Sequence, residues 1–198
     1  MRRLLILLVC GLFALAQLSG CQGLGRDKSR VDPTPPKSGV EVIIEGGGEF
    51  PEFLVGRWKA NEHGWKFVFQ PDGTISSAVH TLGKVKLRPG QKTIRRMKKG
   101  GEAIYEPGEW MVHYNPANRE LTVAISLSNF YTELGDDVLE GKSDDLFVGK
   151  INEEGNIWET NWTSFYDYTA HTLEYPQVRM HPEHGESRTL VFEKVTKK

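Results

Sequence analysis

The sequence has little cysteine, no long apolar run and no excess of charge of either sign. Its only cysteines, Cys10 and Cys21, lie near the start of the 198-residue chain, which excludes a disulfide framework or a cysteine-rich metal site in the rest. No stretch of about 18 or more unbroken apolar residues occurs, which excludes a protein with several membrane-spanning helices. With 25 basic and 26 acidic residues, the chain lacks the strongly basic character of a dedicated nucleic-acid binder.

Aromatic residues, by contrast, are plentiful. They make up 10% of the chain, and hydrophobic residues as a whole make up 38%. This composition provides enough apolar surface for a folded core and argues against low-complexity disorder. The length corresponds to one domain of ordinary size.

The first 20 residues have the pattern of a secretory signal. Arg2 and Arg3 precede a 13-residue apolar segment, residues 4–16, which is too short to span a bilayer comfortably as a helix. Leu18-Ser19-Gly20-Cys21 follows after Gln17. This tetrapeptide resembles the lipobox of bacterial lipoproteins, whose cysteine thiol is joined to diacylglycerol before the signal is cut off. The resemblance implies lipidation of Cys21; the alternative is an ordinary signal peptide that contains a chance cysteine.

The resemblance also implies a location. Removal of residues 1–20 takes away two arginines and leaves 23 basic and 26 acidic residues, a net charge of −3. A mildly acidic domain has no electrostatic attraction to anionic lipid, so we expect acyl chains to hold the protein at the membrane. In enteric-type lipoproteins a residue other than Asp after the cysteine, here Gln22, implies the periplasmic face of the outer membrane.

A polar segment separates this anchor from the folded domain. Residues 21–39 contain several glycines and Pro33, Pro35 and Pro36, and they have too little apolar surface to fold. We expect a flexible tether over 21–39 and a domain over 40–198.

The domain shows the period-2 alternation of β-strands. Val40, Val42 and Ile44 predict a short edge strand. Trp65, Phe67 and Phe69 share one face of a second strand, and the turn residues 71–73 connect it to a partner over 74–82. Further strands are expected at 55–60, 110–114, 121–128, 146–151, 157–164 and 188–195. About eight strands without an amphipathic helix predict an all-β, antiparallel up-and-down barrel, or otherwise a sandwich; closure is favoured because it removes exposed edges.

Two short motifs carry a family resemblance. Gly56-Arg57-Trp58 resembles the G-x-W signature of the lipocalin and fatty-acid-binding group, and residues 187–195 are similar to the Arg-bearing last strand of the fatty-acid-binding branch. The resemblance implies a lipocalin-like barrel in which Trp58 plugs one end, Arg188 stacks on its ring and Gly56 allows a close backbone approach. The alternative is that Trp58 is a core aromatic of an unrelated sandwich.

Aromatic residues crowd the region from Trp158 to Tyr175. They favour either an aromatic mouth for an apolar or sugar ligand, with Trp158, Trp162 and Tyr166 as the candidates, or a barrel core with a packed loop. The region also contains Phe165 and Tyr168, and Asn161-Trp162-Thr163 fits a glycosylation sequon that bacterial lipoproteins generally do not use.

Other polar clusters have simpler interpretations. His181 and His184, with His171 upstream, are candidate metal ligands, but Pro182 disfavours a helical ligand pair, and we expect an exposed loop and no bound metal. The pairs Asp136-Asp137 and Asp144-Asp145 lack the pattern of a calcium loop, so we expect solvated charge. The basic run over 92–99 suits either phosphate head groups or a charged hairpin that protects a sheet edge.

These observations leave three hypotheses for function. The first is a non-enzymatic, lipid-anchored barrel that binds a small apolar ligand without a cofactor. The second is an envelope scaffold whose filled barrel acts through surface contacts with partners. The third is a hydrolase that uses His171, His181 or His184. An apolar cavity of about 300 Å³ or more would favour ligand binding.

Overall fold

The computed structural model describes residues 39–80, 84–96, 100–171, 178–180 and 185–196. The expected signal over 1–20, Cys21, all of the tether except Gly39, and Tyr175, His181 and His184 lie outside the described residues. The described residues form an all-β structure with a short 3-10 turn at Glu52–Leu54 and no α-helix. None of them lies in a helix with the length and hydropathy required to cross a bilayer.

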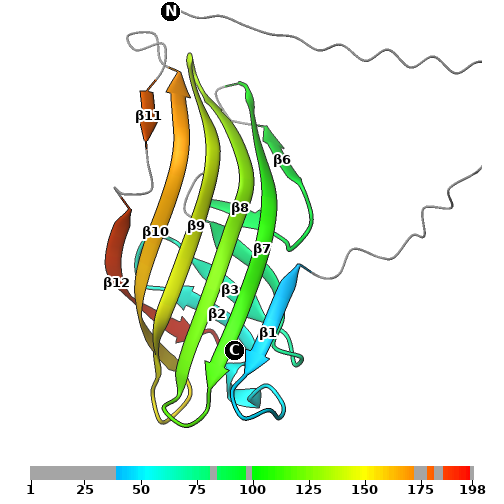
Figure 1. Ribbon diagram of the computed structural model, residues 1–198, viewed down its shortest axis with the longest axis vertical. Coiled ribbons are helices and arrows are strands. Elements are labelled where there is room, and N and C mark those ends of the chain that lie inside the picture. Colours follow the sequence, from blue (N-terminus) through cyan, green and yellow to red (C-terminus); the bar gives the residue numbers. More distant parts are fainter. Residues whose placement is uncertain (1–38, 81–83, 97–99, 172–177, 181–184, 197–198) are drawn as a thin grey trace, which may run out of the picture. The chain divides into compact units, whose positions relative to one another are not determined.

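The strands differ greatly in length. The elements are β1 (Val40–Ile44), η1 (Glu52–Leu54), β2 (Gly56–Ala60), β3 (Lys66–Phe69), β4 (Ile75–His80), β5 (Val85–Leu87), β6 (Thr93–Arg96), β7 (Glu102–Asn115), β8 (Glu120–Leu134), β9 (Asp137–Ile151), β10 (Ile157–His171), β11 (Val178–Met180) and β12 (Glu186–Lys194). Strands β7 to β10 have 14 or 15 residues each, about three times the length of β2 and β3. Figure 1 shows β2 and β3 behind these long strands.

All the strands belong to one sheet, in the order β1-β7-β8-β9-β10-β12-β2-β3-β4-β5, with β6 beside β7 and β11 beside β10. Every pairing is antiparallel except that of β1 with β7. The prediction of an antiparallel all-β fold is therefore confirmed. The short edge strand predicted at Val40, Val42 and Ile44 is also present.

The prediction of a closed barrel of about eight strands was wrong. Within the described residues the strand ladder ends at β1 and β5, so the sheet is open and contains more strands. The reason lies at the outer edge of β7. Strand β1 pairs with its residues Trp110–Tyr114 and β6 pairs with Glu102–Tyr105, which leaves little of that edge for β5. The short strands β1 and β6 cover this edge in place of closure, and β6 presents the exposed Arg95 and Arg96.

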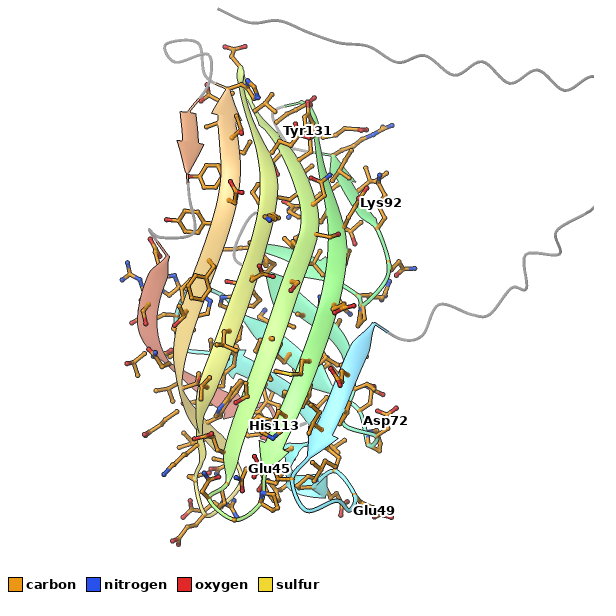
Figure 2. All side chains as sticks on the ribbon, viewed as in Figure 1. Glu45, Glu49, Asp72, Lys92, His113 and Tyr131 are labelled. Carbon is orange, nitrogen blue, oxygen red and sulfur yellow. The ribbon has the colours of Figure 1, made fainter. Side chains whose placement is uncertain are left out.

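Two side-chain contacts fix β1 beside β7. His113 Nε2 lies 3.0 Å from Glu45 Oε1, and Asn115 donates a hydrogen bond to the same carboxylate (Figure 2). The predicted turn at Pro71-Asp72-Gly73 connects β3 to β4 and packs nearby. Gly73 has φ of +82°, and a Cβ atom there would lie 2.7 Å from Val42 Cγ1, so glycine is required for both conformation and space.

Aromatic side chains fill the space between the two layers of the sheet. Phe67 of β3 packs against Phe147 of β9 and Trp158 of β10, with ring centroids 5.2 and 6.1 Å apart. The predicted alternation of Trp65, Phe67 and Phe69 is confirmed, since all three are almost completely buried. Each such aromatic pair contributes about 0.5–1.5 kcal/mol beyond area burial. This part of the interior is a packed core.

Candidate functional site

A pocket opens on the inner face of the sheet beyond the end of β4. Its volume is about 290 Å³, and its lining residues come from β4, β8, β9, β10 and β12: His80, Phe130, Ser143, Trp162, Ser164, Tyr166, Tyr168 and Glu186. The strand period explains this set. Trp162, Ser164, Tyr166 and Tyr168 alternate along β10, and Ser143 lies directly opposite Tyr166 on β9.

A buried cluster of three polar side chains borders this pocket. Asp145 Oδ2 lies 3.0 Å from His80 Nε2, and the indole NH of Trp162 donates to Asp145 Oδ1 over 2.9 Å. The side chains of His80 and Asp145 are only 5% and 1% exposed. Both carboxylate oxygens therefore have partners, as a buried carboxylate requires. The cluster holds Trp162 in place as one wall of the pocket.

The interpretation of Asp144 and Asp145 as solvated charge is correct only for Asp144. Asp144 is exposed and accepts a hydrogen bond from Ser126 Oγ over 2.6 Å. Asp145 points inward because β9 begins at Asp137 rather than near residue 146, and Asp145 therefore shares the inner face with Phe147. The alternation Ser143, Asp145, Phe147 was a signal for this orientation, whereas nothing in the sequence around His80 indicated its role.

Three buried hydroxyl groups near the pocket lack hydrogen-bond partners among the described residues: Ser143 Oγ, Thr132 Oγ1 and Tyr105 OH. Ser143 lines the pocket. Tyr105 lies directly opposite Phe130, and Thr132 lies two residues after Phe130 on the same face of β8. A buried hydroxyl without a hydrogen-bond partner lowers the stability of the folded state by about 1–3 kcal/mol. Three such hydroxyls at this end of the interior therefore favour the binding of a polar group there.

The indole NH groups of Trp65 and Trp158 also have no hydrogen-bond partner in the described part of the chain. Trp158 lies in the aromatic core, with its ring centroid 4.9 Å from that of Phe192. Of the three aromatic candidates from the sequence, Trp162 and Tyr166 line the pocket and Trp158 does not. Phe165, between them, points outward and is 41% exposed.

Tyr168 forms a further part of the aromatic wall. Its ring centroid lies 5.4 Å from that of Tyr166 and 6.3 Å from that of Phe130. Burial, together with the charge of the neighbouring Tyr166, raises the pKa of Tyr168. Its phenol therefore remains protonated at neutral pH and can donate a hydrogen bond.

The residues of the expected signature are arranged differently from the prediction. Trp58 is fully buried, and its indole NH donates to the carbonyl oxygen of Leu54 over 2.8 Å. Arg188 lies opposite Trp162, is exposed and is 3.7 Å from Glu186, so the expected stack of Arg188 on Trp58 was wrong. Lys194 lies opposite Trp58 instead, and its Nζ donates to the carbonyl oxygen of Phe53 over 2.6 Å. Arg188 precedes Lys194 by six positions along β12, which places it too far from Trp58 to stack on the ring.

Gly56 is the first residue of β2, two positions before Trp58. Its φ of +120° is a conformation that favours glycine. A Cβ atom at this position would lie 3.6 Å from Lys194 Cε. The requirement for glycine is therefore conformational, and the close approach is to the lysine side chain.

No cation site is indicated in the part of the chain that the structure describes, since it contains no group of three or more His, Cys, Asp or Glu side chains suited to a metal. His171 ends β10. A larger hollow of about 770 Å³ lies at the opposite end of the sheet and includes Glu49 and Asp72 (Figure 2). Most of its lining residues are exposed, and no unpartnered buried polar atom lies among them, so the smaller pocket is the better candidate.

No family model, curated protein or solved structure is significantly similar to this chain.

Proposed function

We propose that this chain is a lipid-anchored protein of the bacterial envelope, attached through Cys21, that binds a small amphipathic ligand in the pocket bordered by Trp162. The proposal rests on one observation. Aromatic rings of Phe130, Trp162 and Tyr168 line the pocket together with Ser143, whose hydroxyl is buried and has no hydrogen-bond partner among the described residues.

The pocket's chemistry favours a particular kind of ligand. Ring faces bind a flat or apolar body, and Ser143 and Tyr168 offer hydroxyl groups that bind one polar substituent. The volume of about 290 Å³ is near the lower end of the range for ligand pockets, about 300–1,000 Å³, so the ligand is small. A purely apolar molecule would leave the Ser143 hydroxyl without a partner.

Binding is favoured over hydrolysis by the position of the same hydroxyl. A serine nucleophile needs a base within hydrogen-bond reach, and Ser143 Oγ has no such partner among the described residues. His80 uses its Nε2 atom in the contact with Asp145. We therefore propose a structural role for this His–Asp pair, which holds the pocket wall.

A scaffold without a ligand is the second candidate, favoured by the packed core on the β2–β3 side. Four large apolar side chains on the surface, which are 39–59% exposed, offer contacts for a partner: Ile43, Ile94, Phe165 and Val195. These four side chains do not line the pocket. Substitutions at them should impair a scaffold function, whereas substitutions in the pocket should impair ligand binding.

A fluorescent probe tests the binding function. 1-Aminoanthracene has a flat apolar body and one amine, and we expect its emission to rise on titration with the protein. Ser143→Leu fills the pocket and should abolish the rise, whereas Thr122→Leu, on the opposite face of β8, should not. Equal probe binding by the wild type and Ser143→Leu would overturn the assignment of the ligand to this pocket.

A further inference from the structure

Four cations surround a second hollow, on the outer face of β2 to β5. This hollow has a volume of about 330 Å³ and is lined by Arg57, Lys59, Lys66, Val68, Ser77, Val79, Lys86 and Val195. All four cationic side chains are exposed, whereas Val68 and Val79 are half-buried between them. We call these four residues, Arg57, Lys59, Lys66 and Lys86, the outer cationic cluster.

Strand register brings the cluster together. Lys59 on β2 lies directly opposite Lys66 on β3, and Lys66 lies opposite Val79 on β4. Val79 in turn lies opposite Lys86 on β5. Directly opposed residues of an antiparallel pair share a face, so Lys59 and Lys66 form a like-charge cross-strand pair, which is locally unfavourable. An anion between them would remove this repulsion.

The cluster is not neutralised within the part of the chain that the structure describes. No carboxylate there lies within 4.0 Å of any of the four cationic groups. Glu193 lies opposite Lys59 in the ladder between β12 and β2, yet the two form no ion pair. Lys92, which is outside the cluster, does form an ion pair: its Nζ lies 2.6 Å from Glu106 Oε1. The outer cationic cluster is therefore a locally positive surface, although residues 21–198 carry a net charge of −3.

We infer that the outer cationic cluster binds the phosphate groups of anionic phospholipids. The charges match the phosphate, and three valine side chains among the lysines give an apolar contact that a free phosphate ion would not use. This site is separate from the ligand pocket, because Trp58 and Phe67 on the same strands point to the opposite, buried face. The inference goes beyond the proposed function and does not depend on lipidation of Cys21.

Short-chain lipids below their critical micelle concentration test the inference. The full chain with Cys21→Ser carries no acyl group, and reductive ¹³C-methylation makes its lysines visible by NMR while preserving their charge. Dihexanoyl phosphatidylglycerol should shift the signals of Lys59, Lys66 and Lys86 but not those of Lys142 and Lys150 on β9. Dihexanoyl phosphatidylcholine and glycerol phosphate are the comparison ligands.

Matched charge variants complete the experiment. The double variant Lys66→Gln/Lys86→Gln should raise the Kd for phosphatidylglycerol about 30-fold, whereas Lys142→Gln/Lys150→Gln, with the same net charge, should change it less than about twofold. Equal losses in the two variants, or equal binding of phosphatidylcholine, would overturn the site. Glycerol phosphate binding as tightly as phosphatidylglycerol would contradict the lipid as its source. A missing acyl group on native Cys21 would refute the anchor and leave this result unaffected.

Discussion

His80 Nε2 and Asp145 Oδ2 lie 3.0 Å apart, although 65 positions separate the two residues in the sequence. The contact joins the end of β4 to the middle of β9, and thus links the two layers of the sheet beside the pocket. Trp65 packs against the imidazole with a centroid separation of 4.9 Å, so the pair is shielded from water on its core side.

Removal of the buried carboxylate should therefore destabilise the protein strongly. Asp145→Ala removes the contacts of this carboxylate with His80 and with the Trp162 indole NH, and we expect a loss of about 3–5 kcal/mol in the free energy of unfolding. Asp144→Ala, one residue away and exposed, should cost less than about 1 kcal/mol. Urea unfolding of both variants checks this expectation. Similar losses would show that the buried pair has no special role.

The unpartnered hydroxyls near the pocket should contribute to binding and not to stability. Ser143→Ala and Thr132→Val each remove a buried oxygen that has no hydrogen-bond partner among the described residues. We expect the stability to stay within about 0.5 kcal/mol of the wild type or to increase. The affinity for 1-aminoanthracene should fall in Ser143→Ala. A marked loss of stability in this variant would mean that the hydroxyl has a partner in the folded protein.

Lys194 should matter more to the fold than Arg188. Lys194 Nζ donates to the Phe53 carbonyl, whereas Arg188 is exposed and 3.7 Å from the exposed Glu186. Lys194→Met should lower the free energy of unfolding by about 1.5 kcal/mol, and Arg188→Met by less than about 0.5 kcal/mol. Thermal unfolding gives the comparison. The reverse order would restore Arg188 as the stabilising cation of the last strand.

The turn between β3 and β4 should make stability depend on pH. The Thr74 side chain and then its backbone NH donate to Asp72 Oδ1, and these hydrogen bonds lower the pKa of Asp72 in the folded state. The stabilisation is therefore complete above the unfolded-state pKa and is lost as the pH falls through the folded-state pKa. NMR titration should show an Asp72 pKa below its ordinary value, and Thr74→Val should raise it. An unchanged pKa in Thr74→Val would contradict this cause.

Replacement of Cys21 should release the protein from membranes. The lipobox-like segment ending at Cys21 supplies the proposed acylation site, and Cys21→Ser removes the thiol that this proposal requires. After cell fractionation we expect the wild type in the envelope fraction and the variant mainly in the soluble fraction. Cys10→Ser, within the apolar segment, is the matched control and should leave the distribution unchanged. Complete retention of Cys21→Ser with the envelope would refute the anchor.

Local sequence signals predicted the apolar parts of the main strands and the turn between β3 and β4, but not β5 or β11, the full length of β7 to β10, or the long-range pairing. Alternation at Trp65, Phe67 and Phe69 fixed a buried face, and Asp72-Gly73 fixed a turn, because both depend on neighbouring residues only. The parallel pairing of β1 with β7 joins residues 70 positions apart and has no local signal. The open sheet followed from that pairing.

The candidate site was only partly predictable for a related reason. Trp162 and Tyr166 stood out as aromatic residues on one face of a strand. Ser143 and Asp145 did not, because polar residues on the inner face of β9 resemble a loop when the strand is identified by its apolar positions. A register shift between Leu127 and Phe130 also interrupts the alternation along β8, although both residues remain buried.

Native mass spectrometry of the protein purified from its own host tests the binding function most directly. We predict a species heavier than the acylated chain by one small molecule, present in the wild type and in Thr122→Leu and absent in Ser143→Leu. The same added mass on each of the three proteins, relative to its own ligand-free mass, or no added mass on any of them, would contradict a ligand held in the pocket beside Trp162.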